Sequence, residues 1–269
     1  MKEERPRGPT AADRVIRIGV LTPHAAIGPE QEFPAMAPGR LDIRVVRVPS
    51  GAGGDPPTTP HALRALTAVP VLDDAAKTLV LDSIDVVGYA STTSAYAIGF
   101  DAETAMVSRL SALAGVPVAA TCASAVLALR VLDVERVALI GAPWFDAEFN
   151  ELGAAYFRSQ GFEVVSSASA ELSRDPRRIE PAAVHAWTSR HVGDEAEGVF
   201  IGGNGFRAAL AIEQLETATG RPVLTSNQVL LWNLLAHAGV PVEITGYGQL
   251  FAHKLERWVR KLGPPESVE

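Results

Sequence analysis

Two short segments rich in hydrogen-bonding groups have the clearest chemical potential in this sequence. The first, residues 91–96, reads Ser-Thr-Thr-Ser-Ala-Tyr and carries five hydroxyl groups directly after a β-branched apolar run. The second, residues 202–207, combines glycines that allow close backbone approach with the amide of Asn204 and the guanidinium of Arg207. Backbone N–H groups at a helix start bind small anions without a formal cation. We therefore predict that the two segments together hold a small carboxylate.

Acid–base candidates near these segments are few. His24 follows the first apolar run of the chain, and it is the one near-neutral acid or base that we expect to reach the same site. A polar loop residue that hydrogen-bonds to backbone is the alternative interpretation of His24. Cys122, at an expected helix start, is either a reactive group with a lowered pKa or a small buried apolar residue.

The sequence contains no pattern that predicts a metal or a nicotinamide cofactor. The other five histidines lack a ligand spacing such as His-x-x-x-His. No Gly-x-Gly-x-x-Gly sequence opens a helix after an early strand, as a dinucleotide site would require. We therefore expect no metal and no cofactor.

Composition narrows the classes of partner. The 269 residues are 47% hydrophobic and 20% charged, which predicts a compact folded protein. The net charge is −7, and no stretch is basic enough to bind nucleic acid. The longest apolar runs are interrupted within about ten residues, too short for a membrane span. The single cysteine fits a reducing cytoplasm. We expect a small carboxylate as the partner, without nucleic acid or membrane, and leave homo-oligomerisation open.

Short β-branched runs alternate with helical patterns, which predicts a parallel α/β protein. Strands are expected at residues 17–21, 43–48, 85–89, 117–120, 136–140, 163–166, 198–201, 222–225 and 242–245. Helices are expected at residues 61–81, with a break or kink at Pro70, and at 102–113, 124–132, 146–159, 181–191, 208–219 and 229–237. Residues 49–60, rich in Gly and Pro, predict an exposed loop at the active site or a subunit contact.

The order of these elements repeats along the chain. Residues 85–93 match residues 197–205, and residues 115–121 match residues 220–226, each pair reading as a strand that runs into a polar segment. Such a duplication predicts two similar parallel-sheet α/β lobes related by a pseudo-twofold axis, with the site in the cleft between them. Residues 15–125 and 226–262 are assigned to the first lobe and residues 126–225 to the second. Residues 1–14 are expected to form a flexible tail.

Six short motifs, in this order, resemble the aspartate/glutamate racemase superfamily, in its branch of maleate cis-trans isomerase and arylmalonate decarboxylase. The motifs are residues 17–23, 89–92, 138–144, 203–207, 226–228 and 246–251. The resemblance implies a cofactor-independent lyase or isomerase that acts on a small carboxylic or dicarboxylic acid. Together with the two polar segments it nominates Ser91, His24 and Asn204 as catalytic residues, and as substrate-binding residues Pro23, Thr92, Thr93, Trp144, Gly203, Gly205 and Arg207.

The chain also departs from the family that it resembles. Racemases and maleate isomerases of this family carry a cysteine in each facing loop, and arylmalonate decarboxylase keeps only the second. This chain has Ser91 and Gly203 at those positions. A serine hydroxyl cannot replace a thiolate without a neighbouring base. Residues 23–26 stand where isomerases carry a carboxylate-binding asparagine, and Trp144 stands where a tyrosine is usual.

The missing thiols favour decarboxylation through an enediolate-like intermediate over two-base racemisation. Preorganised hydrogen-bond donors stabilise such an intermediate without a thiol base. Two alternatives stay open: a catalytically inactive small-acid-binding or regulatory protein on the same fold, and a divergent enzyme of ectoine catabolism or specialised metabolism. Turnover with a panel of small acids separates the enzyme from the inactive binding protein.

Overall fold

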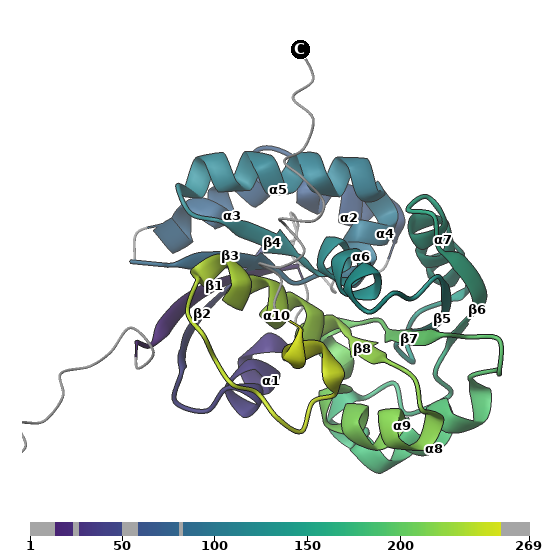
Figure 1. The fold of residues 1–269 in the computed structure, drawn as a ribbon. Coiled ribbons are helices and arrows are strands. Elements are labelled where there is room, and N and C mark those ends of the chain that lie inside the picture. Colours follow the sequence, from purple (N-terminus) through teal and green to yellow (C-terminus); the bar gives the residue numbers. More distant parts are fainter. Residues whose placement is uncertain (1–13, 24–26, 50–58, 81–82, 254–269) are drawn as a thin grey trace, which may run out of the picture.

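The computed structural model describes residues 14–23, 27–49, 59–80 and 83–253, and places them around two four-stranded parallel sheets (Figure 1). The first sheet contains β1 (Ile16–Thr22), β2 (Leu41–Arg47), β3 (Val86–Tyr89) and β4 (Val118–Ala120). The second contains β5 (Arg136–Gly141), β6 (Glu163–Ser169), β7 (Gly198–Ile201) and β8 (Val223–Thr225). The strand orders, β2-β1-β3-β4 and β6-β5-β7-β8, are equivalent. The predicted α/β fold with two similar parallel-sheet lobes is confirmed.

The central strands are apolar because both of their faces are covered. Every residue of β3 and of β7 is buried, as expected for parallel strands that lie between two helical layers. The register pairs Leu21 with Tyr89 in the first sheet and Ile140 with Ile201 in the second. Within each sheet, the two central strands therefore end side by side. The polar segments that follow them begin at equivalent places in the two sheets.

Helices from each half of the sequence cover the sheets of both. The helices are α1 (Pro29–Met36), α2 (Pro60–Thr67), α3 (Val71–Val80), α4 (Thr92–Ile98), α5 (Phe100–Ala114), α6 (Thr121–Val131), α7 (Ala147–Arg158), α8 (Pro181–His191), α9 (Ile212–Thr219) and α10 (Ser226–Ala238). In the first sheet, α3 and α5 lie over one face, and α1 and α10 lie over the other (Figure 1). Helix α10 starts at the end of β8 but packs against β3 and β4. The two halves are therefore interlocked rather than merely adjacent.

Three elements differ from the sequence-based expectation. Residues 242–245 do not form the expected strand. Ile244 is buried and its two neighbours are exposed, and this alternation of buried and exposed residues occurs in half-buried extended segments as well as in strands. Residues 92–98 form α4 rather than a loop, because the side chain of Ser91 caps the helix by accepting from the Ser94 N–H. Helix α1 was not predicted, since it is short and contains Pro34. The expected break at Pro70 is confirmed, and it separates α2 from α3.

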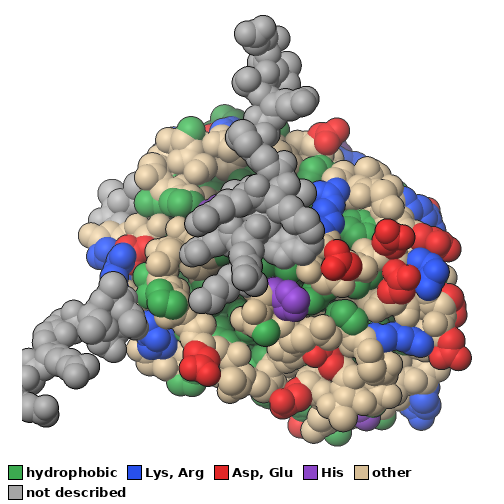
Figure 2. Space-filling view, viewed as in Figure 1, with side chains coloured by type: hydrophobic (Ala, Val, Ile, Leu, Met, Phe, Trp, Pro, Cys, Tyr) green, Lys and Arg blue, Asp and Glu red, His purple; other side chains and the backbone are tan. Residues whose placement is uncertain are grey.

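Some expectations fall on residues that are not described. Residues 1–13 of the expected tail, most of the Gly- and Pro-rich loop (residues 50–58) and residues 254–262 of the first-lobe assignment lie outside the described residues. The lobe boundaries stay a prediction. Within the described part of the chain, the helices are too short or too polar to cross a membrane. On the face drawn in Figure 2, basic and acidic side chains are interspersed, so this face presents no field of a single sign to a polyanion.

An aromatic cluster joins the two halves where α4 packs against α7. The ring of Tyr96 lies so close to Gly153 that a Cβ there would sit 2.7 Å from the ring. The centroid of the Tyr96 ring is 6.0 Å from that of Tyr156 and 6.4 Å from that of Phe157. Glycine at position 153 therefore allows the close helix approach that this aromatic contact requires.

A buried carboxyl group completes this contact between the halves. The Tyr156 hydroxyl on α7 donates to Glu103 Oε2 on α5. Burial raises the pKa of Glu103 from 4.5 to about 7, although the Tyr156 hydroxyl and the N–H groups of Cys122 and Ala123 act to lower it. Glu103 thus contributes a hydrogen bond across the lobes at the cost of desolvating a carboxylate.

Replacing Glu103 by glutamine is expected to remove one pH-dependent part of the free energy of unfolding. A carboxyl group whose folded pKa is raised stabilises the fold below its unfolded pKa of 4.5, and this stability is lost as pH rises through about 7. The glutamine variant lacks that loss. Between about pH 5 and pH 8, the free energy of unfolding of the native protein should therefore fall by roughly 2–3 kcal/mol relative to that of the glutamine variant. Urea unfolding at several pH values measures the difference.

The matched variant Tyr156→Phe keeps the Glu103 carboxyl but removes a donor that lowers its pKa. Its loss of stability should continue to higher pH than in the native protein. If Glu103→Gln and the native protein lose stability with pH at the same rate, Glu103 does not carry a raised pKa.

Candidate functional site

The ends of four strands supply one buried polar cluster. Helices α4, α6 and α10 begin directly after β3, β4 and β8, and place Thr92, Thr121 and Ser226 at their first positions. A tight turn after β7 adds Gly203 and Asn204. The side chains of Thr92, Thr121, Ser226, Asn204 and Asn227 are all buried. The carboxyl ends of parallel strands are where ligands bind in folds of this kind, so this cluster is the candidate site.

Thr92 and Asn204 join the two halves within this cluster. The backbone N–H and the hydroxyl of Thr92 both donate to Asn204 Oδ1, at 3.2 and 3.3 Å. The Gly203 N–H donates to Ser226 Oγ at 2.8 Å and to Thr92 Oγ1 at 3.1 Å. The Thr92 and Ser226 hydroxyl oxygens are 2.9 Å apart and share a hydrogen bond. The structure therefore brings together three residues that the sequence nominated from two distant segments.

A second set of hydrogen bonds runs from Asn204 to a buried carboxyl group. Asn204 Nδ2 donates to Asn227 Oδ1 at 2.9 Å and to Thr121 Oγ1 at 3.2 Å. Asn227 Nδ2 donates to Glu32 Oε2 at 2.6 Å and to the Asn204 carbonyl at 2.8 Å. Burial raises the pKa of Glu32 to about 7, while its hydrogen bonds with Asn227 and the Ala209 N–H lower it. Glu32 is thus a titratable group linked to the site.

Sequence reasoning missed Thr121, Ser226, Asn227 and Glu32 as site residues. For Ser226 and Asn227 a signal existed, because both follow an expected strand and lie in a motif of the family resemblance. Thr121 likewise follows an expected strand, residues 117–120. Glu32 had no such signal, because it lies on a short helix that the apolar pattern does not reveal.

Ser91 and Thr93 lie in the first turn of α4. The Ser91 hydroxyl donates to Ser94 Oγ at 2.7 Å and accepts from the Ser94 N–H at 3.2 Å. Tyr89 adds its hydroxyl as a donor to Ser94 Oγ at 3.0 Å. Both Ser91 and Thr93 are buried. These bonds give Ser91 a capping role, and its catalytic role stays a prediction.

The remaining nominated residues surround the cluster without all joining it. Arg207 donates to Gln31 Oε1 and, at 2.6 Å, to the Pro176 carbonyl, and so bridges α1 to the other half. The Trp144 ring packs edge-on against Phe206 at 6.2 Å between centroids. Pro23, after β1, is buried, as is Gly205 in the turn after β7. His24 lies outside the described residues.

Gly203 occupies a backbone conformation that other residues rarely adopt. Its φ and ψ angles are +111° and +101°, a combination favoured only by glycine. A Cβ built on Gly203 would lie 2.8 Å from the Cβ of Ala142 and 3.5 Å from that of Phe206. A side chain at position 203 would therefore require the backbone to move.

Cys122 is a structural residue in this environment. It is fully buried, and its Sγ lies 3.7 Å from the Thr92 carbonyl. Burial and the neighbouring Glu103 raise the pKa of the Cys122 thiol well above its usual value. The thiol is thus protonated and unreactive, which favours the interpretation of Cys122 as a small buried apolar residue. Within the described ranges, no group of three His, Cys, Asp or Glu side chains is arranged to hold a metal.

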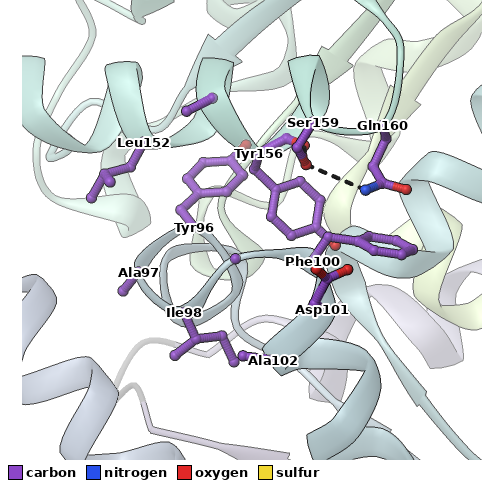
Figure 3. A pocket seen from close by; sticks show the side chains of 12 residues that line it. Tyr96, Ala97, Ile98, Phe100, Asp101, Ala102, Leu152, Tyr156, Ser159 and Gln160 are labelled. Carbon is purple, nitrogen blue, oxygen red and sulfur yellow. Dashed lines mark hydrogen bonds between the residues drawn. The ribbon is translucent and has the colours of Figure 1, made fainter.

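A pocket of about 540 Å³ lies at the opposite end of α4 from the cluster (Figure 3). Tyr96, Phe100 and Tyr156 line it, with Ser159 and Gln160 at one side. The Tyr96 hydroxyl lies 3.2 Å from the position that a Cβ would take on Gly202. Tyr96 therefore lines this pocket and also lies against Gly202, just before the turn that carries Gly203 and Asn204.

One family model matches most of the chain, and several solved structures share its fold. A family model described as arylmalonate decarboxylase matches residues 67–251. A cysteine-to-alanine variant of a maleate isomerase from Pseudomonas putida with maleate has a TM-score of 0.77 and 22% identity, and the match covers 89% of this chain and 98% of that one. No curated protein sequence matches significantly.

Two further solved structures are similar. Maleate cis-trans isomerase from Nocardia farcinica bound to TRIS has a TM-score of 0.77 and 21% identity, with coverage of 91% of this chain and 100% of that one. Unliganded arylmalonate decarboxylase has a TM-score of 0.72 and 21% identity, with coverage of 88% and 99%. At these identities the structural matches establish the fold, whereas the family model covers more than half of this sequence.

Gly203→Ala is expected to destabilise the protein more than a matched substitution at Gly220. Gly220 also has a positive φ, of +66°, but an added Cβ there meets no atom within 4 Å. Gly220→Ala should therefore cost about 1 kcal/mol for its backbone conformation alone. Gly203→Ala should cost a further 1–3 kcal/mol or so, because its Cβ overlaps Ala142. Urea unfolding of both variants measures the two costs.

The double variant Gly203→Ala with Ala142→Gly removes the overlapping Cβ. It should recover part of the loss, and the unrecovered part reports the backbone conformation of residue 203. Equal destabilisation by Gly203→Ala and Gly220→Ala would show that position 203 has room for a side chain.

Proposed function

Because the chain belongs to the arylmalonate decarboxylase family, as the match over residues 67–251 shows, we propose that it is a cofactor-independent lyase or isomerase. Its substrate class is small carboxylic or dicarboxylic acids, and decarboxylation is the favoured reaction. The bound acid contacts Thr92, Gly203 and Asn204 between the two sheets.

The observation that carries this proposal is the buried contact between Thr92 and the turn after β7. Two backbone N–H groups, of Thr92 and Gly203, meet there from different sheets. Both now donate to side-chain oxygens of the cluster. A carboxylate oxygen offers the same kind of acceptor, so an entering acid can replace these internal acceptors. Donors positioned in a buried site stabilise the negative charge of an enediolate more strongly than water does.

Decarboxylation places modest demands on such a site. One carboxylate leaves as CO₂, and the electron pair of the broken C–C bond moves onto the remaining carboxylate as an enediolate. A proton then adds to the α-carbon and gives the product acid. The site must stabilise the enediolate and supply one proton, for which the sequence nominates Ser91 and His24.

The cysteine content argues against a covalent thiol mechanism in this chain. A similar solved structure is a cysteine-to-serine variant of the Nocardia farcinica isomerase with a covalently bound succinylcysteine intermediate. This chain has one cysteine in total, Cys122, and it is buried with a raised pKa. A cis-trans isomerisation through a thiol adduct is therefore disfavoured, which leaves decarboxylation as the reaction that the donors can assist.

A second candidate is a binding protein without catalysis on the same site. The capping bonds of Ser91 favour it, because the Ser91 hydroxyl is engaged with Ser94 rather than with a base. The same acid would bind at Thr92 and Asn204, but no bond would break.

We expect CO₂ release from α-substituted malonates in D₂O, with one solvent deuterium at the α-carbon of the product. Thr92→Val removes the hydroxyl that contacts Asn204 and Ser226, and should lower kcat/KM by about 10²–10³. Thr217→Val makes the same chemical change at an exposed position of helix α9, where the hydroxyl donates to the Glu213 carbonyl. This control should leave kcat/KM unchanged. Proton and carbon NMR of the reaction mixture measure both.

Binding of malonates without CO₂ release in the native protein would favour the non-catalytic binding protein. Equal activities of Thr92→Val and Thr217→Val would remove Thr92 from the site. Conversion of maleate to fumarate by the native protein, without CO₂ release, would replace decarboxylation by isomerisation.

A further inference from the structure

A directed chain of hydrogen bonds connects Glu32 to the ligand-binding contact. Glu32 Oε2 accepts from Asn227 Nδ2, and Asn227 Oδ1 accepts from Asn204 Nδ2. Asn204 Oδ1 in turn accepts from the N–H and the hydroxyl of Thr92. In each of these hydrogen bonds the donor's proton points toward the Glu32 end of the chain. The four side chains are buried, so water does not compete for these bonds.

Both ends of this chain of hydrogen bonds are constrained, because the Glu32 carboxylate can only accept and the Thr92 backbone N–H can only donate. An amide side chain has a donor end and an acceptor end, and it can turn to exchange them. The Ala209 N–H occupies Glu32 Oε1 at 2.8 Å, which leaves Oε2 for Asn227. Asn227 must therefore present its NH₂ group to Glu32 and its oxygen to Asn204. Asn204 must then present its NH₂ group to Asn227 and its oxygen to Thr92.

We propose that Glu32 is a positioning residue that, acting through Asn227, turns the carbonyl oxygen of Asn204 rather than its NH₂ group toward Thr92. This inference rests on the proposed function only in taking the contact between Thr92 and Asn204 as the acid-binding site. An amide oxygen in that position repels a carboxylate, whereas an NH₂ group attracts one. The charge on Glu32 thereby sets the affinity of the site for anions.

The charged groups around Glu32 leave it as the group that titrates near neutral pH among the described residues that face it. Arg207 is cationic throughout this range and acts to lower the pKa of Glu32. Tyr247 stays neutral because burial raises the pKa of its hydroxyl. Glu30, on the same helix, has a lowered pKa and is paired with Arg47. Glu103, whose pKa is also raised to about 7, lies beside Cys122 and Ala123 on α6, so a change near pH 7 is assigned to Glu32 when Glu32→Gln abolishes it and Glu103→Gln does not.

Protonation of Glu32 should reverse the direction of these hydrogen bonds. A carboxyl O–H donates to Asn227, which then turns its oxygen toward Glu32 and its NH₂ group toward Asn204. Asn204 follows and presents its NH₂ group to Thr92. The reversal loses two bonds to backbone groups, one from Asn227 Nδ2 to the Asn204 carbonyl and one from the Thr92 N–H to Asn204 Oδ1. In the reversed state the Thr92 N–H and the Asn204 NH₂ group are both donors for an entering carboxylate. Glu32→Gln should imitate the protonated state, because the fixed Ala209 N–H requires the Gln oxygen and leaves the NH₂ group for Asn227.

The test observes the amide groups directly. The protein contains four asparagines, Asn150, Asn204, Asn227 and Asn233. Selective ¹⁵N-asparagine labelling therefore gives four side-chain NH₂ signals. In the native protein the signals of Asn204 and Asn227 should shift together with a midpoint near pH 7. In Glu32→Gln they should stay at the low-pH positions of the native protein at every pH. The signals of Asn150 and Asn233 should not follow this midpoint.

Malonate serves as the ligand probe in the second arm, measured by calorimetry. Its affinity for the native protein should fall by about fivefold to tenfold between pH 6 and pH 8.5, the effect of one hydrogen bond gained or lost. In Glu32→Gln the affinity should stay high across this range. Glu30→Gln removes a carboxylate from the same helix that takes no part in the chain of hydrogen bonds. The malonate affinity of this variant should depend on pH as that of the native protein does. Glu32→Asp, which keeps the acceptor, should retain the pH dependence.

Each outcome separates the inference from the proposed function. Asparagine signals that show no common midpoint, or that move identically in Glu32→Gln, overturn the positioning role. Signals that behave as expected without malonate binding leave the positioning role standing and overturn the proposed ligand. Malonate binding whose pH dependence is equal in Glu32→Gln and Glu30→Gln overturns the positioning role alone. Should Glu32→Gln fail to fold, the native titration and Glu32→Asp decide the question.

Discussion

The hydrogen bonds from Thr92 to Asn204 are the contact on which the site depends. Two parallel sheets of equivalent order bring their polar strand ends to one junction, and that junction is buried. Buried polar groups must find partners, and here most of the partners come from the other sheet. The cost of leaving Thr92 or Asn204 unpaired therefore holds the two halves together at the place where an anion can be stabilised. Fold and site share the same bonds.

Two buried carboxyl groups flank this junction and connect the halves in different ways. Glu32 reaches from α1 to Asn227 and the Ala209 N–H, whereas Glu103 reaches from α5 to the Tyr156 hydroxyl. Burial raises the pKa of each to about 7. A buried carboxylate is costly unless it is hydrogen-bonded, and both are. Only Glu32 is linked to Asn204, so a pH change has separable effects on the site and on the contact between α5 and α7.

The sequence was sufficient for the architecture and for part of the site. Strands in parallel sheets are continuous apolar runs, and the polar residues after them are easily found. Thr92, Gly203 and Asn204 were nominated on that ground. The structure places them in hydrogen-bonding contact, and their role in binding stays a prediction. Ser91 shows the limit of this reasoning, because the same hydroxyl that suggests chemistry also caps a helix. Glu32 was missed because a single carboxylate on a short helix has no periodic signal, and its partner Asn227 is 195 positions away.

The backbone conformation and the packing at Gly203 both disfavour a side chain at this position. The resemblance implies a cysteine at this position, whereas here the φ angle of +111° disfavours any side chain and the Cβ of Ala142 occupies the space. Two changes, in conformation and in packing, therefore separate this turn from one that presents a thiol. With no side chain at position 203, the turn offers the Gly203 N–H and the Asn204 amide to the acid that we propose as the ligand. An amide can face an anion with either its oxygen or its NH₂ group. The residue that orients Asn204 therefore influences anion binding at this site, as the choice of nucleophile influences the chemistry of a thiol enzyme.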